Sequence, residues 1–142
     1  MIYSRNQKQQ IFRCFINTYF EFLDFIQKHI GKDNKDFKNF YQKNKLLRKA
    51  NVKIFIKKWY ETISIPYGKE IMNGNIDYFV NKNYDHEISM SGNIGKELSI
   101  QTYIDHMKNA YHNVDEEITQ NILNYIQQCT KMSVLYYNVK TN

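Results

Sequence analysis

The sequence KIFIKKWYETISIPYGKEIMNGNIDYFVNKNY, residues 53–84, differs from every other part of the chain. It contains the only tryptophan, Trp59, and the only proline, Pro66. Large apolar residues recur before the proline at helical spacing, which predicts a helix. We expect this helix to end before Pro66, because proline disfavours helical geometry at the preceding residue and lacks a backbone N–H donor. Residues 53–84 are therefore predicted to form a bend against which the other helices pack.

The chain after this bend is predicted to continue with shorter pieces. A turn carrying Tyr67, Ile71 and Met72 leads to Gly74, which interrupts the helical pattern. Asn75 is then expected to cap a helical piece over residues 76–81. Residues 85–99 lose periodicity and gather Ser, Gly and Asn, which predicts a loop.

Four further segments show apolar residues at three- and four-residue steps, typical of helices with one buried face. The first covers about residues 7–30 and is expected to end at Gly31. The second covers residues 36–50, with Asp33 or Asn34 as its cap. The others begin after Ser99 and Asp115, and the last has the most regular stripe: Ile118, Ile122, Tyr125, Ile126, Cys129, Met132 and Tyr136.

These patterns predict an all-α fold, in which about six helices form one compact bundle with a proline-bent centre. We expect residues 1–142 to make one domain, divided into a basic half (1–58), the bend and core (53–84), the loop (85–99) and a C-terminal helix pair (100–138). The length suits a single domain, and the 42% hydrophobic content argues against a disordered chain. Trp59 is expected to anchor the core.

Three features predict the compartment. Cys14 and Cys129 both lie in apolar helical patterns, where we expect them to act as small hydrophobic residues without a disulfide. The polar N-terminal segment does not read as a secretory signal. The most apolar segment, residues 11–26, carries three charges, so no membrane span is expected. An intracellular location is therefore predicted.

Charge is divided unevenly along the chain. Residues 1–58 hold fourteen Lys or Arg against four Asp or Glu, whereas residues 59–142 hold six against ten. A basic half can bind nucleic acid, an anionic membrane or an acidic protein, and it can also drive self-association. The alternative is that the lysines only solvate exposed helix faces, and the sequence leaves this choice open.

The basic residues are densest in residues 28–58. Helical spacing is expected to bring together a set of candidate nucleic-acid-binding residues: Lys45, Arg48, Lys49, Lys53 and Lys57. Such a patch would neutralise phosphates, and Tyr41 and Tyr60 could stack on a single strand. Because lysine predominates over arginine, we do not expect base-specific recognition.

Catalytic and metal-binding patterns were not found. The four histidines, at positions 29, 86, 106 and 112, lack the spacing that puts two ligands on one helix face. Asp85, His86 and Glu87 are adjacent in a loop and could bind a cation, although such runs are common in loops. We therefore expect no enzyme activity, no metal and no cofactor. The sequence leaves open whether two catalytic residues from distant helices come together.

The segments FIKKWYETISIPYGKEIMNGNIDYFVNKNY (55–84), YIDHM (103–107) and ILNYIQQCTKMSVLYYN (122–138) resemble small helical proteins of nucleocytoplasmic large DNA viruses. The resembling positions are Trp59, Tyr67, Ile71, Gly74, Asp77, Phe79, Lys82, Tyr84, Tyr125, Ile126, Gln127, Lys131, Ser133 and Tyr136. Asn83 stands where the pattern has an acidic residue, and the basic first third lies outside it.

The resemblance implies a viral origin and carries over no activity. With it, the sequence predicts a non-enzymatic structural or assembly protein that contacts another viral or host protein, or itself. The alternative is a nucleic-acid-associated protein that uses residues 28–58 in genome packaging or viral transcription. The expected location is the host cytoplasm, the viral factory or the virion. Ser133 and Tyr136 are expected either to fix a helix contact or to line a partner groove.

Overall fold

The computed structural model describes residues 2–3, 5–29, 35–74, 116–138 and 140–141. In chain order, the elements are β1 (Ile2–Tyr3), α1 (Arg5–His29), α2 (Lys35–Ala50), α3 (Ile54–Trp59), the π-helical turn η1 (Tyr60–Ser64), α4 (Ile65–Met72), α9 (Glu116–Asn138) and β2 (Lys140–Thr141). The all-α prediction agrees with this part of the chain, which is almost entirely helical.

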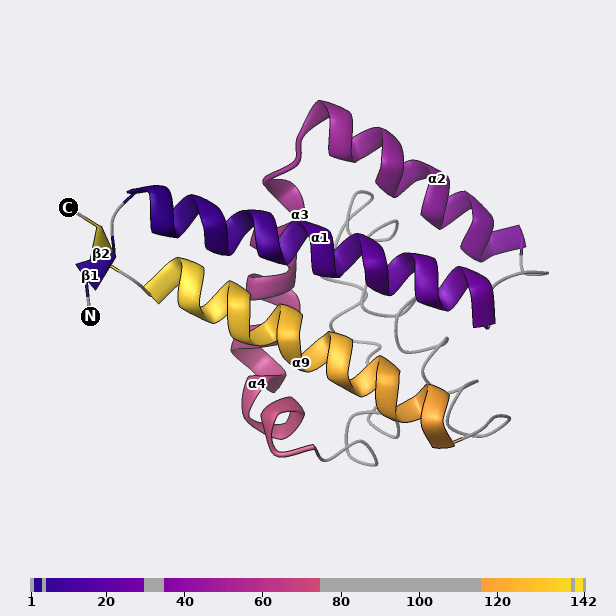
Figure 1. Ribbon diagram of the computed structural model, residues 1–142. Coiled ribbons are helices and arrows are strands. Elements are labelled where there is room, and N and C mark those ends of the chain that lie inside the picture. The colour runs from indigo at the N-terminus through magenta and orange to yellow at the C-terminus, as the bar shows by residue number, and fades with distance from the viewer. Residues whose placement is uncertain (1, 4, 30–34, 75–115, 139, 142) are drawn as a thin grey trace.

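Helices α1 and α9 lie side by side and run in opposite directions (Figure 1). Their aromatic contacts follow this antiparallel register, since Phe12 meets Tyr136 near one end and Phe22 stacks on Tyr125 near the other. Both helices turn the stripe that their periodicity predicts toward the core. In α9, four of its residues are only partly buried: Ile118, Tyr125, Met132 and Tyr136. Next to the start of α1 and the end of α9, β1 pairs with β2 in parallel, over only two residues each.

The segment from α3 to α4 crosses α1 and α9 (Figure 1) and supplies the centre of the core. Trp59 is 3% exposed, and its ring meets Phe15, Tyr19 and Phe22 edge-on. Its indole N–H donates to the Thr130 hydroxyl of α9 at 3.1 Å. The expectation that Trp59 anchors the core is therefore confirmed.

Two more polar contacts fasten this segment to α9. The hydroxyls of Ser64 and Ser133 are 2.6 Å apart, and both side chains are buried. The Gln127 amide donates to the Ile71 carbonyl at 3.0 Å. Of the two roles predicted for Ser133, the structure confirms the helix contact. Buried hydroxyls that satisfy each other can lie in a core without a large desolvation cost.

The prediction that the helix ends before Pro66 is wrong. The backbone stays helical from Ile54 to Met72, and the residues before the proline form a π-helical turn. The Ile65 N–H donates to the Tyr60 carbonyl, five residues earlier. This wider turn starts a new α-helix at Ile65, so Pro66 falls in the first turn of α4, the part of a helix where proline is best tolerated.

The other end of α4 agrees with the sequence. Helix α4 ends at Met72, and Gly74 follows with a φ of 75°, a left-handed conformation that glycine adopts readily. Its N–H donates to the Ile71 carbonyl at 3.0 Å. Gly74 therefore ends the helix as predicted.

Helix α2 packs on α1 through an aromatic face that includes a buried amide. Phe37 and Phe40 are buried as expected, and Tyr41 and Leu47 are partly buried against the same core. Asn44, which lies one turn after Phe40, is 0% exposed. It accepts a hydrogen bond from the Tyr19 hydroxyl and donates to the Phe40 carbonyl at 2.7 Å. Its burial was not predicted from the sequence.

Several predictions lie outside the described residues. These are the helix end at Gly31, the caps at Asp33 or Asn34, Asn75 and Asp115, the piece at 76–81, the loop at 85–99 and the helix after Ser99. The count of about six helices therefore stays a prediction. Among the described helices, none is long and apolar enough to cross a membrane.

The two cysteines differ in burial. Cys129 is 0% exposed, as expected for a small hydrophobic residue, whereas Cys14 is exposed on α1 and the same expectation is wrong for it. Position 14 lies on the side of α1 opposite the buried face, which begins at Phe15 and Ile16. Both cysteines are free thiols.

Alkaline pH is expected to destabilise the fold through α9. Burial raises the pKa of the Cys129 thiol from its ordinary value of 9.0, and it also raises the pKa of Tyr137 above its ordinary 10.0. A group whose neutral form is favoured in the folded state contributes stability below its unfolded pKa, and this contribution is lost as pH rises through that value. We therefore expect the free energy of unfolding to fall above about pH 9.

Urea unfolding at about pH 7 and about pH 9.5 measures this effect, since the thiol titrates first in this range. Cys129→Ala is the control, because it removes the thiol and should lose less stability over the same interval. If the variant and the unchanged protein lose equal stability, the buried thiol is not the cause.

Candidate functional site

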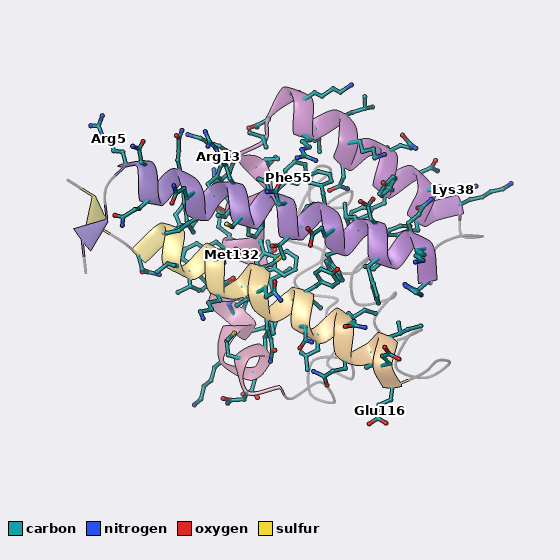
Figure 2. All side chains as sticks on the ribbon, viewed as in Figure 1. Arg5, Arg13, Lys38, Phe55, Glu116 and Met132 are labelled. Carbon is teal, nitrogen blue, oxygen red and sulfur yellow. The ribbon has the colours of Figure 1, made fainter. Side chains whose placement is uncertain are left out.

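The five predicted nucleic-acid-binding residues are all exposed. Lys45, Arg48 and Lys49 lie on α2, Lys53 immediately precedes α3, and Lys57 lies one turn further along α3. Figure 2 shows the side chains of the described residues on the ribbon, with Lys38 of α2 and Arg5 of α1 extending away from the helices. Of the five, Lys45 and Arg48 lie over aromatic rings, and Lys53 lines a pocket.

On α2, two of the cations lie over aromatic rings. The Lys45 ammonium is 4.5 Å from the centroid of the Tyr41 ring, and the Tyr41 hydroxyl donates to Asp24 of α1. The Arg48 guanidinium is 4.5 Å from the centroid of the Phe20 ring. Phe20 is only 7% exposed, so Arg48 covers the edge of the core while its N–H groups stay available at the surface.

The rings of the two tyrosines predicted to stack on a single strand already contact other side chains of this chain. Tyr41 has Lys45 over its ring, and Tyr60 stacks on Tyr137 with ring centroids 4.6 Å apart. Each ring therefore already has a neighbour within the chain. A third aromatic contact, between Phe12 and Tyr136, lies where α1, α3 and α9 meet.

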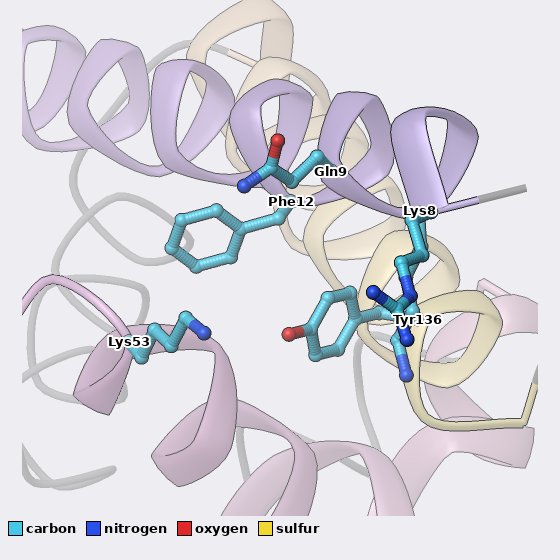
Figure 3. Close-up of a pocket in the computed structure, with 6 residues that line it drawn as sticks. Lys8, Gln9, Phe12, Lys53 and Tyr136 are labelled. Carbon is cyan, nitrogen blue, oxygen red and sulfur yellow. The ribbon is translucent and has the colours of Figure 1, made fainter. Parts of the chain in front are cut away.

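A pocket of about 130 Å³ lies at this junction, lined by Arg5, Lys8, Gln9, Phe12, Lys53 and Tyr136. The α1 residues in this set recur at steps of three and four, so they share one face of the helix. In Figure 3, the Lys53 ammonium and the Tyr136 hydroxyl point toward the same space, and the Phe12 ring closes its far side. The Lys8 ammonium lies 4.7 Å from the centroid of the Tyr136 ring.

The charge at this pocket is one-sided. Three cationic side chains, Arg5, Lys8 and Lys53, line it together with one amide and no carboxylate. No ion pair joins these three cations to an acidic side chain of the described residues. Like charges held close together repel each other, and a bound anion relieves that repulsion. The pocket therefore has the electrostatics of an anion-binding site.

Only one member of the pocket, Lys53, was among the predicted site residues. Arg5 and Lys8 were missed as site residues, and Tyr136 was predicted only to fix a helix contact or to line a partner groove. They come from opposite parts of the sequence and meet only after α1 and α9 pair. A usable signal was present in α1, where two cations and an aromatic residue recur on one face: Arg5, Lys8 and Phe12. Lys53, which meets these residues in the pocket, could not be grouped with them without the fold.

The described part of the chain brings together no metal site. No group of three or more His, Cys, Asp or Glu side chains there is placed to hold a metal ion. His29 is exposed and packs on Phe25, with ring centroids 4.4 Å apart. Asp85, His86 and Glu87 lie outside the described residues, as do the other two histidines.

The positions that carry the viral resemblance include buried residues, exposed residues and residues outside the described part of the chain. Tyr67, Ile71, Ile126 and Ser133 are buried, whereas Lys131 is exposed. Asp77, Phe79, Lys82, Asn83 and Tyr84 lie outside the described residues. Comparison with protein-family models, with curated proteins and with solved structures gave no match for this chain.

Proposed function

We propose that this chain is a non-enzymatic binding protein that associates with nucleic acid through its basic surface. That surface is defined by seven exposed or pocket-lining cations: Arg5, Lys8, Lys45, Arg48, Lys49, Lys53 and Lys57. The observation that carries the proposal is the pocket in which Arg5, Lys8 and Lys53 meet without an acidic partner among the described residues.

Phosphate is the anion that best fits such a surface. Contacts between Lys or Arg and phosphates supply most of the sequence-independent affinity of nucleic-acid-binding proteins, because each contact releases a condensed counterion. Lysine predominates in the surface, which favours contacts to the backbone over readout of base edges. Phe12 and Tyr136 lie beside these cations and pack on each other, so the affinity rests on the charges and not on stacked bases.

Salt dependence tests this proposal. The affinity for labelled single- and double-stranded DNA and RNA is measured by fluorescence anisotropy between about 50 and about 200 mM salt, where the logarithm of affinity should fall linearly. The slope reports about 0.9 per phosphate contact on duplex DNA and about 0.7 on a single strand. The double variant Lys8→Gln, Lys53→Gln should therefore lower the slope by between one and two.

A second double variant with the same net charge serves as the matched control. Lys69 and Lys131 are exposed on α4 and α9, outside the basic surface, so the double variant Lys69→Gln, Lys131→Gln also loses two charges. It should bind with the slope of the unchanged protein. Equal slopes for the two double variants would show that net charge alone attracts the nucleic acid, and no binding at low salt would refute the proposal.

A second candidate is a structural or assembly module that contacts another protein, viral or host, or a second copy of itself. It is favoured by large apolar side chains exposed on α4 and α9: Ile65 at 64%, Met72 at 47%, Tyr137 at 40% and Val134 at 39%. Apolar groups exposed near one another are common at protein contacts. The viral origin and the location in the host cytoplasm, viral factory or virion belong to this proposal through the sequence resemblance.

Sedimentation equilibrium over a range of protein concentrations distinguishes this second candidate when the partner is a second copy. The variant Ile65→Ser, Met72→Ser should then shift the protein toward monomer. Leu46→Ser serves as control, because Leu46 is also exposed, at 67%, but lies on α2 within the basic surface. A monomer at all concentrations would leave self-association without support.

A further inference from the structure

We infer that the pocket between α1, α3 and α9 binds a phosphate monoester, which in a nucleic acid is the phosphate at a strand end. This inference deepens the proposed nucleic-acid association and rests on it. It assigns to Arg5, Lys8, Lys53 and Tyr136 a role distinct from that of the remaining basic surface: they recognise one terminal group, whereas Lys45, Arg48, Lys49 and Lys57 contact the backbone.

The size of the pocket limits what can enter. Its volume of about 130 Å³ is well below the roughly 300–1,000 Å³ of pockets that enclose drug-sized ligands. A nucleoside is therefore too large to be enclosed, but a single phosphoryl group fits. The rings of Phe12 and Tyr136, with centroids 5.9 Å apart, are already in contact with each other, so a base cannot stack between them.

The donors of the pocket suit the oxygens of a phosphoryl group. Arg5 offers a planar guanidinium that can donate two parallel hydrogen bonds, and Lys8 and Lys53 offer compact ammonium charges. The Tyr136 hydroxyl points into the same space as Lys53 in Figure 3 and can donate one more bond. None of these groups has a fixed acidic partner among the described residues that a ligand would have to displace.

The charge favours a monoester over a diester. A phosphate monoester carries about −1.5 to −2 at pH 7, whereas each internal phosphodiester of a nucleic acid carries only −1. Three cations around one small pocket are better neutralised by the higher charge. A monoester also presents three terminal oxygens instead of two, which matches the number of cationic side chains.

The first turn of α1 strengthens this argument. An α-helix N-terminus carries partial positive charge and normally favours acidic side chains, but the first turn of α1 contains none. Arg5 and Lys8 occupy it and add to the positive potential. Cations at this place disfavour the helix unless an anion compensates them, and departures from local preference of this kind are typical of functional sites.

The test compares oligonucleotides of one sequence that carry a 5′-phosphate, a 3′-phosphate or only hydroxyl ends. We expect tighter binding of at least one phosphorylated end, by about tenfold, which corresponds to one added set of charge-assisted hydrogen bonds. Inorganic phosphate should compete with this preference. If all three oligonucleotides bind equally, the inference is wrong while the proposed association with nucleic acid stands.

Two variants locate the effect in the pocket. Lys53→Gln should abolish the preference for the phosphorylated end, whereas Lys57→Gln removes an equal charge one turn further along α3 and should retain it. Tyr136→Phe keeps the ring and removes only the hydroxyl, so it should reduce the preference several-fold. Loss of the preference in Lys57→Gln as well as in Lys53→Gln would overturn the assignment. Circular dichroism and thermal unfolding check that each variant is folded.

A separate measurement distinguishes failure of the inference from failure of the proposed function. Inorganic phosphate is titrated into the protein while the backbone amide signals of Arg5, Lys8 and Tyr136 are followed by NMR. Saturable shifts that Lys53→Gln removes, in a protein that binds no oligonucleotide, would support a site for free phosphate monoesters and refute the nucleic-acid proposal. Absence of shifts, together with equal binding of all strand ends, would refute the phosphate pocket alone.

Discussion

Trp59→Ala is expected to lower the free energy of unfolding by about 3–5 kcal/mol, the range found when a large aromatic side chain is removed from a core. Trp59 is 3% exposed and touches three aromatic rings of α1, those of Phe15, Tyr19 and Phe22. The substitution leaves a cavity between α1 and α9 that the crossing helix cannot close without bending. It also removes the donor to the Thr130 hydroxyl.

Chemical denaturation measures this loss, and two further variants separate its causes. Trp59→Phe keeps an aromatic ring but removes the hydrogen bond to Thr130, so it should cost less, about 1–3 kcal/mol. Leu46→Ala removes an apolar side chain that is 67% exposed, and we expect a change within about 0.5 kcal/mol. A loss below about 1 kcal/mol in Trp59→Ala would contradict the central place of Trp59 in the core.

The second large effect concerns the buried amide between α1 and α2. Asn44→Ala is expected to lower the free energy of unfolding by about 2–3 kcal/mol, because it removes the acceptor of the Tyr19 hydroxyl and the amide that donates to the Phe40 carbonyl. Asn44 and Tyr19 are 0% and 2% exposed, so solvent cannot readily replace the lost partner. Truncation of the side chain also leaves a small cavity.

A double-mutant cycle tests whether the pair acts as a unit. Tyr19→Phe removes the hydroxyl, and the double variant with Asn44→Ala should be clearly more stable than the sum of the two single losses predicts, because no unpaired hydroxyl remains. Asn39→Ala is the matched control, since Asn39 is exposed on the other side of α2. Additive losses in the cycle would show that the hydrogen bond contributes little.

The helices could be predicted from sequence wherever one periodic stripe decides burial. In α1 and α9, residues at three- and four-residue steps are large and apolar, so the buried face follows from the pattern alone, as for Phe15, Phe22 and Ile126. The burial of Trp59 could be predicted for the same reason. These are local properties of a helix, and they do not depend on which partner covers the face.

The π-helical turn before Pro66 could not be predicted, because it depends on contacts between helices. Proline alone favours a helix end at the preceding residue. In the structure the helix continues through one widened turn. In this turn the Thr62 hydroxyl donates to the Lys58 carbonyl at 2.7 Å. Ser64 is held by Ser133 from α9 in the same region. The contact between Ser64 and Ser133 joins residues that are 69 positions apart, which no local pattern connects.

The burial of Asn44 and the pocket were missed for different reasons. Asn44 lies among lysines, so its segment looks like a solvated face, although its spacing from Phe37, Phe40 and Tyr41 puts it on the buried side. The pocket joins residues of α1, α3 and α9, and its existence depends on how these elements cross. The pairing of β1 with β2 involves only two residues on each side, too few for any alternating pattern.

The pairing of α1 with α9 also affects how the protein is made. Phe12 and Phe22 meet Tyr136 and Tyr125, so the aromatic face of α1 finds its main partner only after roughly a hundred more residues have been translated, on the order of 5–20 s at typical ribosome speeds. Contacts between such distant segments also slow folding, because a long loop must close before they form. During that interval we expect the aromatic face of a nascent α1 to be partly uncovered, and exposed apolar surface of this kind favours aggregation.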